Sequence, residues 1–347
     1  MMSRALRINR LNNLSNAQWL RLTSSVWRNG DDDYRTQNTL SSNHKPLSSV
    51  PFPTLINSNP QPPDELKRQH PATFAESDVR KLILFFTKKG ETVLDPFLGS
   101  GSTSLACYQT SRNCIGIELF RTWVSLSKRR LMKACGRSVK KCKTTDLHDV
   151  SIDLRKGLHY ELLCGDSRIR LNDVGRESID FVMTSPPYWN ILAKDGDHKV
   201  LRTRKKHGLP TNYGNSASNL GEVASYASFL IELRKVFLGC ARVLRAGRYL
   251  CVIVADFRHG DKFYPFHSDL IEQVETCGLG LQGITVIAHN SKHLYPYGMP
   301  YAYVSNIHHS YALIFRKRDG HNAHHVEVMN EVSQETHTRS ARRAYII

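Results

Sequence analysis

The sequence has 347 residues and a formal net charge of +17, which is more than a fold needs and indicates an anionic partner, nucleic acid ahead of an anionic membrane. Its apolar fraction of 40% is that of a globular protein. Its length allows one large α/β domain with appendages, or two small domains. No apolar run approaches the roughly 20 residues that span a bilayer, so we expect no transmembrane helix and no membrane partner.

The first 28 residues contain five arginines and no acid. This composition is typical of an organellar transit peptide, and equally of a basic helix that lies on nucleic acid. The apolar spacing predicts a helix over residues 15–27, and the Asn-, Ser- and Pro-rich residues 29–63 indicate a surface connection. Without a transit peptide, the expected location is the cytoplasm or nucleoid of a prokaryote, or the nucleus of a eukaryote.

From residue 77 onward, apolar runs of strand length alternate with helical patterns. Strands are expected at residues 91–94, 114–117, 161–164, 179–183, 249–255, 284–288 and 311–315. Helices are expected at residues 77–88, 102–110, 121–134, 226–244 and 267–277. This alternation predicts a mostly parallel, doubly wound α/β sheet, closed by the last two strands as an antiparallel pair. Residues 136–158 are polar and basic and are expected to form an insertion.

Residues 95–103, Asp-Pro-Phe-Leu-Gly-Ser-Gly-Ser-Thr, form a glycine-rich turn between a strand and a helix. Gly99 and Gly101 let a ligand approach the backbone, and the helix that follows aims N–H groups at negative charge. The dinucleotide-binding motif requires a third glycine where Ser104 stands, and the phosphate-binding P-loop requires a lysine that is absent. Neither of these two sites is therefore expected.

Three acids, Asp95, Glu118 and Asp166, stand at the ends of three consecutive strands. An acid at the position of Glu118 accepts hydrogen bonds from both hydroxyls of a ribose, and Asp166 could accept one from an adenine amino group. The alternative is that each acid caps the helix that follows it, because Asp is a favoured N-cap residue.

The apolar strand at residues 179–183 ends in Ser185-Pro186-Pro187-Tyr188. The prolines cannot continue a sheet, and they stiffen the chain where open α/β sheets place their ligands. The Ser185 hydroxyl and the Pro186 carbonyl could accept hydrogen bonds from one amino group, and Tyr188 offers a ring on which a base can stack. Trp189 is expected to be packing.

These two motifs together resemble the amino-methylating DNA methyltransferases that use S-adenosylmethionine, most closely the cytosine-N4 branch, over about residues 65–317. The resemblance implies a Rossmann-like, seven-stranded methyltransferase sheet and methyl transfer to the N4 amine of a cytosine flipped out of double-stranded DNA. It assigns the catalytic role to Ser185, Pro186, Pro187 and Tyr188. It assigns cofactor binding to His70, Phe74, Asp95, Pro96, Phe97, Gly99, Gly101, Ser102, Thr103, Glu118 and Asp166.

The chain is expected to divide into a basic N-terminal part (1–64), the methyltransferase domain (65–317) and a polar, disordered tail (318–347). A long basic loop at residues 190–222 falls inside the domain. Its basic side chains are expected either to contact DNA phosphates or to be exposed on a solvated loop. The residues are Lys199, Arg202, Arg204, Lys205 and Lys206.

The eight cysteines form no C-x-x-C pair, and no H-E-x-x-H motif occurs, so we expect buried thiols and no metal site. Three other activities stay open: adenine-N6 methylation of DNA, amino-methylation of RNA, and nucleic-acid binding without catalysis. The recognition sequence, the biological role and the oligomeric state are not specified by the sequence.

Overall fold

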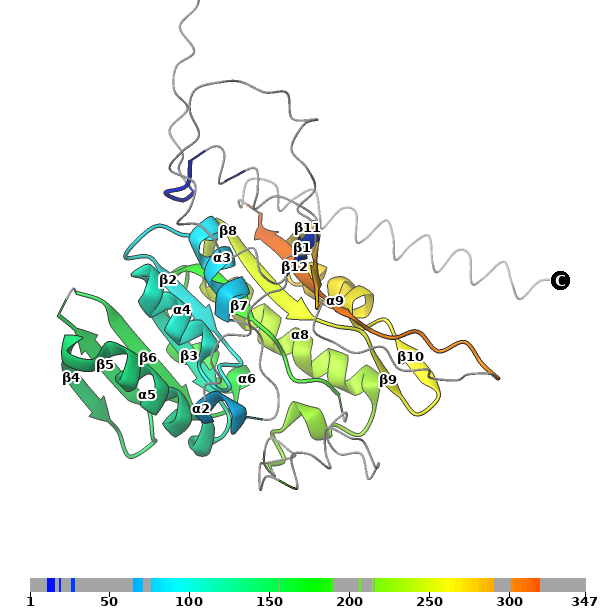
Figure 1. The fold of residues 1–347 in the computed structure, drawn as a ribbon, viewed down its shortest axis with the longest axis horizontal. Helices are drawn as coiled ribbons and strands as arrows, with labels where there is room; N and C mark the ends of the chain where they lie inside the picture. Colours follow the sequence, from blue (N-terminus) through cyan, green and yellow to red (C-terminus); the bar gives the residue numbers. More distant parts are fainter. Residues whose placement is uncertain are drawn as a thin grey trace, which may run out of the picture.

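The computed structural model describes residues 11–15, 19, 26–28, 65–70, 76–155, 157–189, 206, 214, 216–289 and 301–318. In this part of the chain, ten strands form one sheet in the order β1-β11-β12-β8-β7-β2-β3-β6-β5-β4 (Figure 1). The strands on the two sides of the glycine turn are β2 (Thr92–Asp95) and β3 (Asn113–Glu118). The others are β1 (Val26–Arg28), β4 (Val139–Thr144), β5 (Val150–Leu154), β6 (His159–Cys164), β7 (Ile179–Thr184), β8 (Leu244–Val254), β11 (Leu279–Ala288) and β12 (His309–Lys317).

Five neighbouring strands at the centre of the sheet, β6, β3, β2, β7 and β8, run parallel. Strand β12 lies between β8 and β11 and runs antiparallel to both. The seven predicted strands are therefore confirmed, and they lie side by side. Their order reverses between β2 and β7, so the carboxyl ends of these two strands form a switch point, where open α/β sheets bind ligands.

The helices cover both faces of the sheet. They are α2 (Glu65–Arg68), α3 (Glu76–Phe86), α4 (Ser102–Thr110), α5 (Arg121–Cys135), α6 (Ser167–Arg170), α8 (Tyr226–Val243) and α9 (Phe266–Glu275). Single 3₁₀ turns lie at Gly136–Ser138, Leu171–Asp173 and Leu220–Glu222. None of the helices in the described ranges has both the length and the apolar character that a membrane crossing requires.

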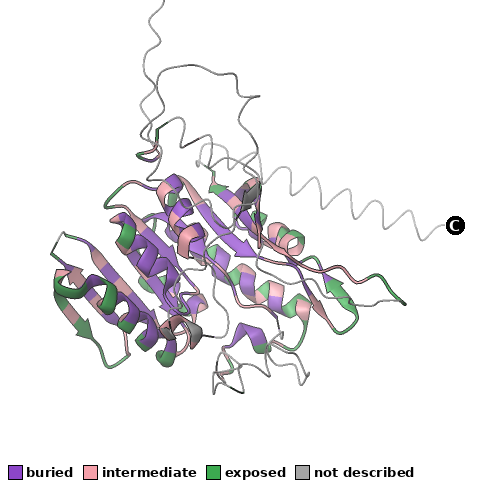
Figure 2. Ribbon diagram, viewed as in Figure 1, coloured by how far each residue is buried: buried purple, intermediate pink, exposed green. Residues whose placement is uncertain are grey.

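Alternate residues of the central strands supply two separate apolar cores. Val93 packs with α3, α4 and α5 on one face, whereas its neighbour Leu94 packs with α8 and α9 on the other. Phe181 and Val182 of β7 divide between the same two cores. Figure 2 shows the buried residues on the central strands and the exposed ones on β4 and on the hairpin of β9 (Phe257–His259) and β10 (Lys262–Tyr264). Because strands covered on both faces are apolar throughout, they are the clearest signal in the sequence.

Three strands differ from the expectation. The end of the predicted helix 15–27 is instead strand β1, which pairs with β11 in parallel. The predicted insertion 136–158 contains β4 and β5, an antiparallel pair that extends the sheet beyond β6. The seven expected strands are thus part of a ten-stranded sheet. The tail beyond residue 318 lies outside the described residues.

Candidate active site

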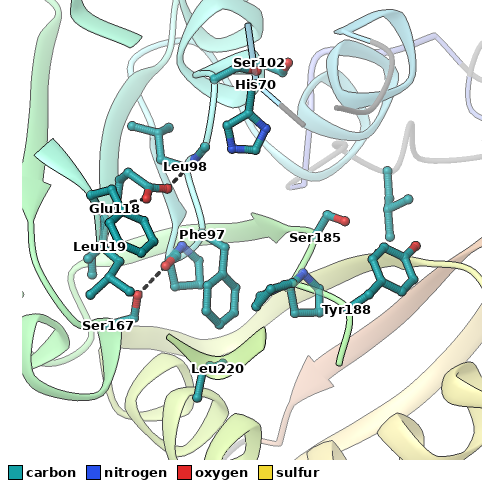
Figure 3. A pocket seen from close by; sticks show the side chains of 18 of the residues that line it. His70, Phe97, Leu98, Ser102, Glu118, Leu119, Ser167, Ser185, Tyr188 and Leu220 are labelled. Carbon is teal, nitrogen blue, oxygen red and sulfur yellow. Dashed lines mark hydrogen bonds between the residues drawn. The ribbon is translucent and has the colours of Figure 1, made fainter. Parts of the chain in front are cut away.

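One cavity of about 460 Å³ lies at the carboxyl ends of the parallel strands. Its walls come from the turn after β2, the end of β3, the start of α6, the turn after β7, the ends of β8 and β11, and the start of β12. Figure 3 shows Phe97 between two groups of side chains, with Glu118 and Ser167 on one side and Ser185 and Tyr188 on the other. The structure therefore brings the glycine turn and the proline turn to one space.

Most of the residues predicted from the sequence line this cavity. They are His70, Pro96, Phe97, Gly99, Ser102, Glu118, Asp166, Ser185, Pro186, Pro187 and Tyr188. Asp95, Gly101 and Thr103 lie behind the turn and are not part of the wall. Phe74 lies outside the described residues.

The glycine turn is a cradle in which side chains would not fit. Gly99 and Gly101 have φ angles of +52° and +80°, in a region that L-residues with side chains rarely adopt. A Cβ atom on Gly99 would stand 3.1 Å from the His70 ring, and one on Gly101 would stand 2.9 Å from the Ser127 side chain. Ser127 Oγ donates to the Gly99 carbonyl at 2.7 Å and holds the turn from behind.

Asp95 connects the two turns. One carboxylate oxygen accepts from Thr103 Oγ1 at 2.6 Å, and the other accepts from Thr184 Oγ1 at 2.8 Å and from the Phe97 N–H at 3.0 Å. Burial raises the pKa of Asp95 to about 6, despite these three hydrogen bonds. Since Thr184 directly precedes Ser185, Asp95 fixes the distance between the cradle and the proline turn.

Glu118, at the end of β3, is buried and supports the same turn. Its two oxygens accept from the Gly99 N–H at 2.9 Å and the Phe120 N–H at 3.0 Å. Burial raises the pKa of Glu118 to about 7, and the nearby Asp95 adds to the rise, while the backbone hydrogen bonds oppose it. Glu118 does not cap α5, because the N-cap residue of that helix is Phe120 and makes no side-chain cap.

Asp166 caps α6, so the capping alternative is correct for this acid. Its carboxylate accepts from the Arg168 backbone N–H at 2.9 Å and from the Arg168 guanidinium at 2.6 Å. Burial alone would raise the pKa of Asp166, but the hydrogen bonds from Arg168 outweigh it and the pKa is lowered. Asp166 is thus ionised at neutral pH and fixed at the cavity wall.

Ser102, the first residue of α4, lines the cavity with an unusual hydroxyl. Its Oγ is buried and has no hydrogen-bond partner among the described residues. A buried polar atom without a partner is costly, so its presence in a cavity wall indicates a ligand with a polar group.

The proline turn presents Ser185 and Tyr188 to the cavity from the side opposite Glu118 (Figure 3). Ser185 makes no hydrogen bond to any residue in the described part of the chain. The Tyr188 hydroxyl accepts from the Ala255 N–H at 2.9 Å, and its ring meets Phe257 edge-on at 6.0 Å. Burial raises the pKa of Tyr188 to about 12, so the phenol stays neutral. It can stack a ring but cannot act as a base near pH 7.

Trp189 is packing, as expected. It is 9% exposed, its Nε1 donates to the Val223 carbonyl at 2.8 Å, and its ring lies 4.9 Å from that of His259. It anchors the proline turn to the neighbouring segments.

Sequence reasoning missed the wall opposite the glycine turn. This wall consists of Ile253, Ala255, Ile287, His289 and Ser310, at the ends of β8, β11 and β12. His289 Nε2 and Ser310 Oγ lie 2.8 Å apart. No local motif marks His289 and Ser310, and only the antiparallel pairing of β11 with β12 brings them together.

The end of the long basic loop also reaches the cavity. Ser218, Asn219 and Leu220 line it, and a Cβ atom on Gly214 would stand 2.7 Å from the Phe120 ring. Of the five cations expected on DNA, Lys206 is exposed and Lys199, Arg202, Arg204 and Lys205 lie outside the described residues. No group of three His, Cys, Asp or Glu side chains that could hold a metal occurs in the described ranges.

Comparison with known proteins finds a family match that includes the glycine turn at residues 95–103. Residues 8–129 match the family model N6_N4_Mtase, DNA methylase. The type II methyltransferase M.SmaI of Serratia marcescens is 38% identical over 78 residues, which are 22% of this chain and 25% of that protein. M.BglI of Bacillus subtilis is 37% identical over 97 residues, 27% of this chain and 28% of that protein. The chain thus spans about a quarter of the length of these relatives.

Solved structures resemble the chain only loosely. TTHA0409 of Thermus thermophilus, complexed with S-adenosyl-L-methionine, is 24% identical with a TM-score of 0.32, over 45% of this chain and 54% of that one. A TehB-like SAM-dependent methyltransferase of Corynebacterium glutamicum is 10% identical with a TM-score of 0.36, over 71% and 89%. The likeness to a family therefore rests on the sequence matches: residues 8–129 are similar to the N6/N4 family of DNA methylases, and short stretches of the chain are similar to type II methyltransferases.

Proposed function

We propose that the chain transfers a methyl group from S-adenosylmethionine to the exocyclic N4 amine of a cytosine flipped out of double-stranded DNA. One observation carries this proposal: the glycine cradle and Ser185–Tyr188 line a single cavity, and Asp95 ties the two together. A methyl donor and an acceptor base can therefore meet there.

The cradle side of the cavity suits the cofactor. S-adenosylmethionine, when bound, supplies a methyl group on a positively charged sulfur, which is already a strong electrophile. The unpartnered Ser102 hydroxyl and the N–H groups at the start of α4 suit the carboxylate of its methionine end. Glu118 suits the ribose hydroxyls, and Asp166 suits the adenine amino group.

The proline turn suits the amine. A cytosine amino group is a poor nucleophile because its lone pair is delocalised into the ring. Acceptors at the Ser185 hydroxyl and the Pro186 carbonyl favour the tetrahedral nitrogen with a localised lone pair, so they stabilise the transition state more than the ground state. The neutral Tyr188 ring offers a stacking surface for the flipped base.

We propose cytosine rather than adenine as the target base because of Ser185. The resemblance to the cytosine-N4 branch rests on serine, rather than Asp or Asn, as the first residue of the tetrapeptide Ser185–Tyr188. Adenine-N6 methylation is the alternative, since the same cavity and the same acceptors would serve an adenine amine.

The decisive experiment is mass spectrometry of nucleosides from duplex DNA incubated with the protein and S-adenosylmethionine carrying a deuterated methyl group. N4-methylcytosine with the deuterium label is expected. Label found only on N6-methyladenine would mean that adenine is the target base. Label found only in RNA supplied in parallel would exclude DNA as the substrate. If no nucleoside is labelled although calorimetry shows cofactor binding, the enzymatic proposal is wrong.

A further inference from the structure

Two segments project from the sheet edge at which the cavity opens. The hairpin of β9 (Phe257–His259) and β10 (Lys262–Tyr264) begins two residues after Ala255, which lines the cavity. Residues 301–308 lead into β12, whose Ser310 also lines the cavity. Figure 1 shows both segments extending beyond the sheet, past the ends of β8 and β12.

The inner face of the hairpin is fixed to the proline turn. The rings of Phe257 and Tyr264 stack with centroids 5.2 Å apart, and both side chains are buried. Phe257 meets Tyr188 edge-on at 6.0 Å, and Tyr264 lies 5.6 Å from Trp189. The position of the hairpin is therefore set by the residues that hold the base side of the cavity.

The outer face of the hairpin and the segment at 301–308 expose aromatic rings and cations. Tyr301 and Tyr303 are 94% and 89% exposed, and Phe263 is 37% exposed. The Arg258 guanidinium lies 5.4 Å from the centre of the Phe263 ring. Lys262 is also exposed, but it lies on the opposite face of the hairpin, with Nζ 4.9 Å from the centre of the Tyr264 ring. Exposed apolar surface that exceeds scattered single residues marks a site for a partner, and both segments carry exposed rings.

We infer that the exposed side chains of these two segments, Lys262, Phe263, Tyr301 and Tyr303, together called the rim, bind the DNA strand on either side of the flipped nucleotide. The inference rests on the proposed function, because it takes DNA as the substrate. When a base leaves the duplex, its neighbours lose a stacking partner and expose their faces. Aromatic rings stack on any base, and cations beside them neutralise phosphates, so the rim holds a distorted strand without reading its sequence.

The test compares rim variants with variants of equal chemistry elsewhere. The rim variants are Lys262→Glu and the double variant Tyr301→Ala, Tyr303→Ala, and the controls are Lys133→Glu on α5 and Leu238→Ala on α8, all at exposed positions. The affinity for a fluorescent duplex is measured by anisotropy, and that for S-adenosylmethionine by calorimetry. The double tyrosine variant should weaken duplex binding about tenfold or more, and Lys262→Glu should reduce the salt slope of binding by about one. The controls should leave the affinity for the duplex within about twofold, as expected for surface changes outside a contact.

The outcome is separable from that of the proposed function. Duplex binding is read without methyl transfer, so a protein that binds duplex but transfers no label would still test the rim. Rim variants that bind duplex as tightly as the controls would overturn the inference, even if cytosine methylation is observed. Unchanged duplex binding with loss of self-association in sedimentation would assign the rings to a second copy of the chain, and would equally overturn it.

Discussion

Ser185 and Asp95 are linked through Thr184, yet the structure gives them different tasks. Ser185 faces the cavity and makes no hydrogen bond to the described protein, so its hydroxyl is available to a substrate. Asp95 is fully buried and bonded to both turns. We expect Ser185→Ala to slow methyl transfer by about two orders of magnitude, the usual loss when one hydrogen-bonding group aimed at the transition state is removed. Single-turnover kinetics would measure it, and cofactor affinity by calorimetry should stay at the wild-type value.

Asp95→Asn is the control for this prediction, because it should impair both measurements. The amide has one acceptor oxygen, so either Thr103 or the pair of Thr184 and Phe97 loses its acceptor, and the link between the cradle and the proline turn is broken. If Ser185→Ala transfers methyl groups at the wild-type rate, or if it weakens cofactor binding as much as Asp95→Asn does, the assigned role of Ser185 is wrong.

Glu118 predicts a pH dependence of cofactor binding. Its pKa is about 7, because of burial, and only the ionised carboxylate can accept from both ribose hydroxyls. Cofactor affinity should therefore fall as the pH is lowered through 7, by about tenfold between pH 8 and pH 6. Calorimetry over this range measures it, and Glu118→Gln, which has no carboxylate to titrate, should bind weakly and with a flat profile. A wild-type profile as flat as that of the variant would contradict the role.

The raised pKa of Glu118 also predicts how the stability of the protein depends on pH. A carboxyl whose pKa is raised by folding binds its proton more tightly in the folded state. The contribution of Glu118 to the stability of the cofactor-free protein is thus present below its ordinary pKa of 4.5 and is lost as the pH rises to about 7. Thermal unfolding of Glu118→Gln should not show this decline of stability with pH. The ionised, buried carboxylate thus lowers the stability of the cofactor-free protein, and hydrogen bonds from a cofactor can offset that cost.

The glycine turn is the element that, in the proposed function, shapes the cofactor side of the cavity. Gly101 has a φ of +80° and stands where a Cβ would approach Ser127 to 2.9 Å, whereas Gly278 has a φ of +78° with no atom within 4 Å. Gly101→Ala and Gly278→Ala should both lose roughly 1–2 kcal/mol from left-handed backbone strain. Only Gly101→Ala should also weaken cofactor binding, because the turn must move away from Ser127. Denaturant unfolding and calorimetry on both variants would show the difference; equal cofactor affinities would mean that the turn is not part of the site.

Strands differ in how plainly the sequence reveals them. The seven central strands are covered on both faces or alternate in burial, so their apolar runs predict them well. Strand β4 carries Lys140, Lys141 and Lys143 at the sheet edge, with a bulge near Val139, and so lacks both signals. Strand β1 has three residues and depends on pairing with Val286–Ala288, a contact that no local pattern records.

The residues of the site also differ in how plainly the sequence reveals them. Residues at the carboxyl ends of parallel strands, such as Glu118 and Ser185, were predictable because successive strands of a doubly wound sheet end at one edge. His289 and Ser310 were not, because they come from an antiparallel pair at the far side of the cavity. The sequence also could not show that Asp166 caps α6 while Asp95 and Glu118 support the cradle, since all three follow a strand.

At the scale of the whole molecule, the proposed function assigns the two halves of the sheet to cofactor and to base. The strands that run from β2 to β6 carry the cradle and the three acids, and the strands that run from β7 to β11 carry the proline turn and the wall opposite. The reversal of strand order between β2 and β7 places both sets over one cavity. The two sets can therefore be probed separately, as the variants of Ser185 and Gly101 do.

The net charge of +17 is a property of the whole molecule and predicts how its affinity for DNA depends on salt. Cations that neutralise phosphates release counterions, so the logarithm of duplex affinity should fall linearly with the logarithm of salt concentration, with a slope of about −0.9 for each phosphate contact. Anisotropy titrations between low and physiological salt should give a slope steeper than about −4 if five or more phosphates are contacted. Cofactor affinity is the internal control, because short hydrogen bonds within a buried cavity are screened far less than charges at the surface. A slope near zero for the duplex, with tight binding, would mean that the excess charge serves some partner other than DNA.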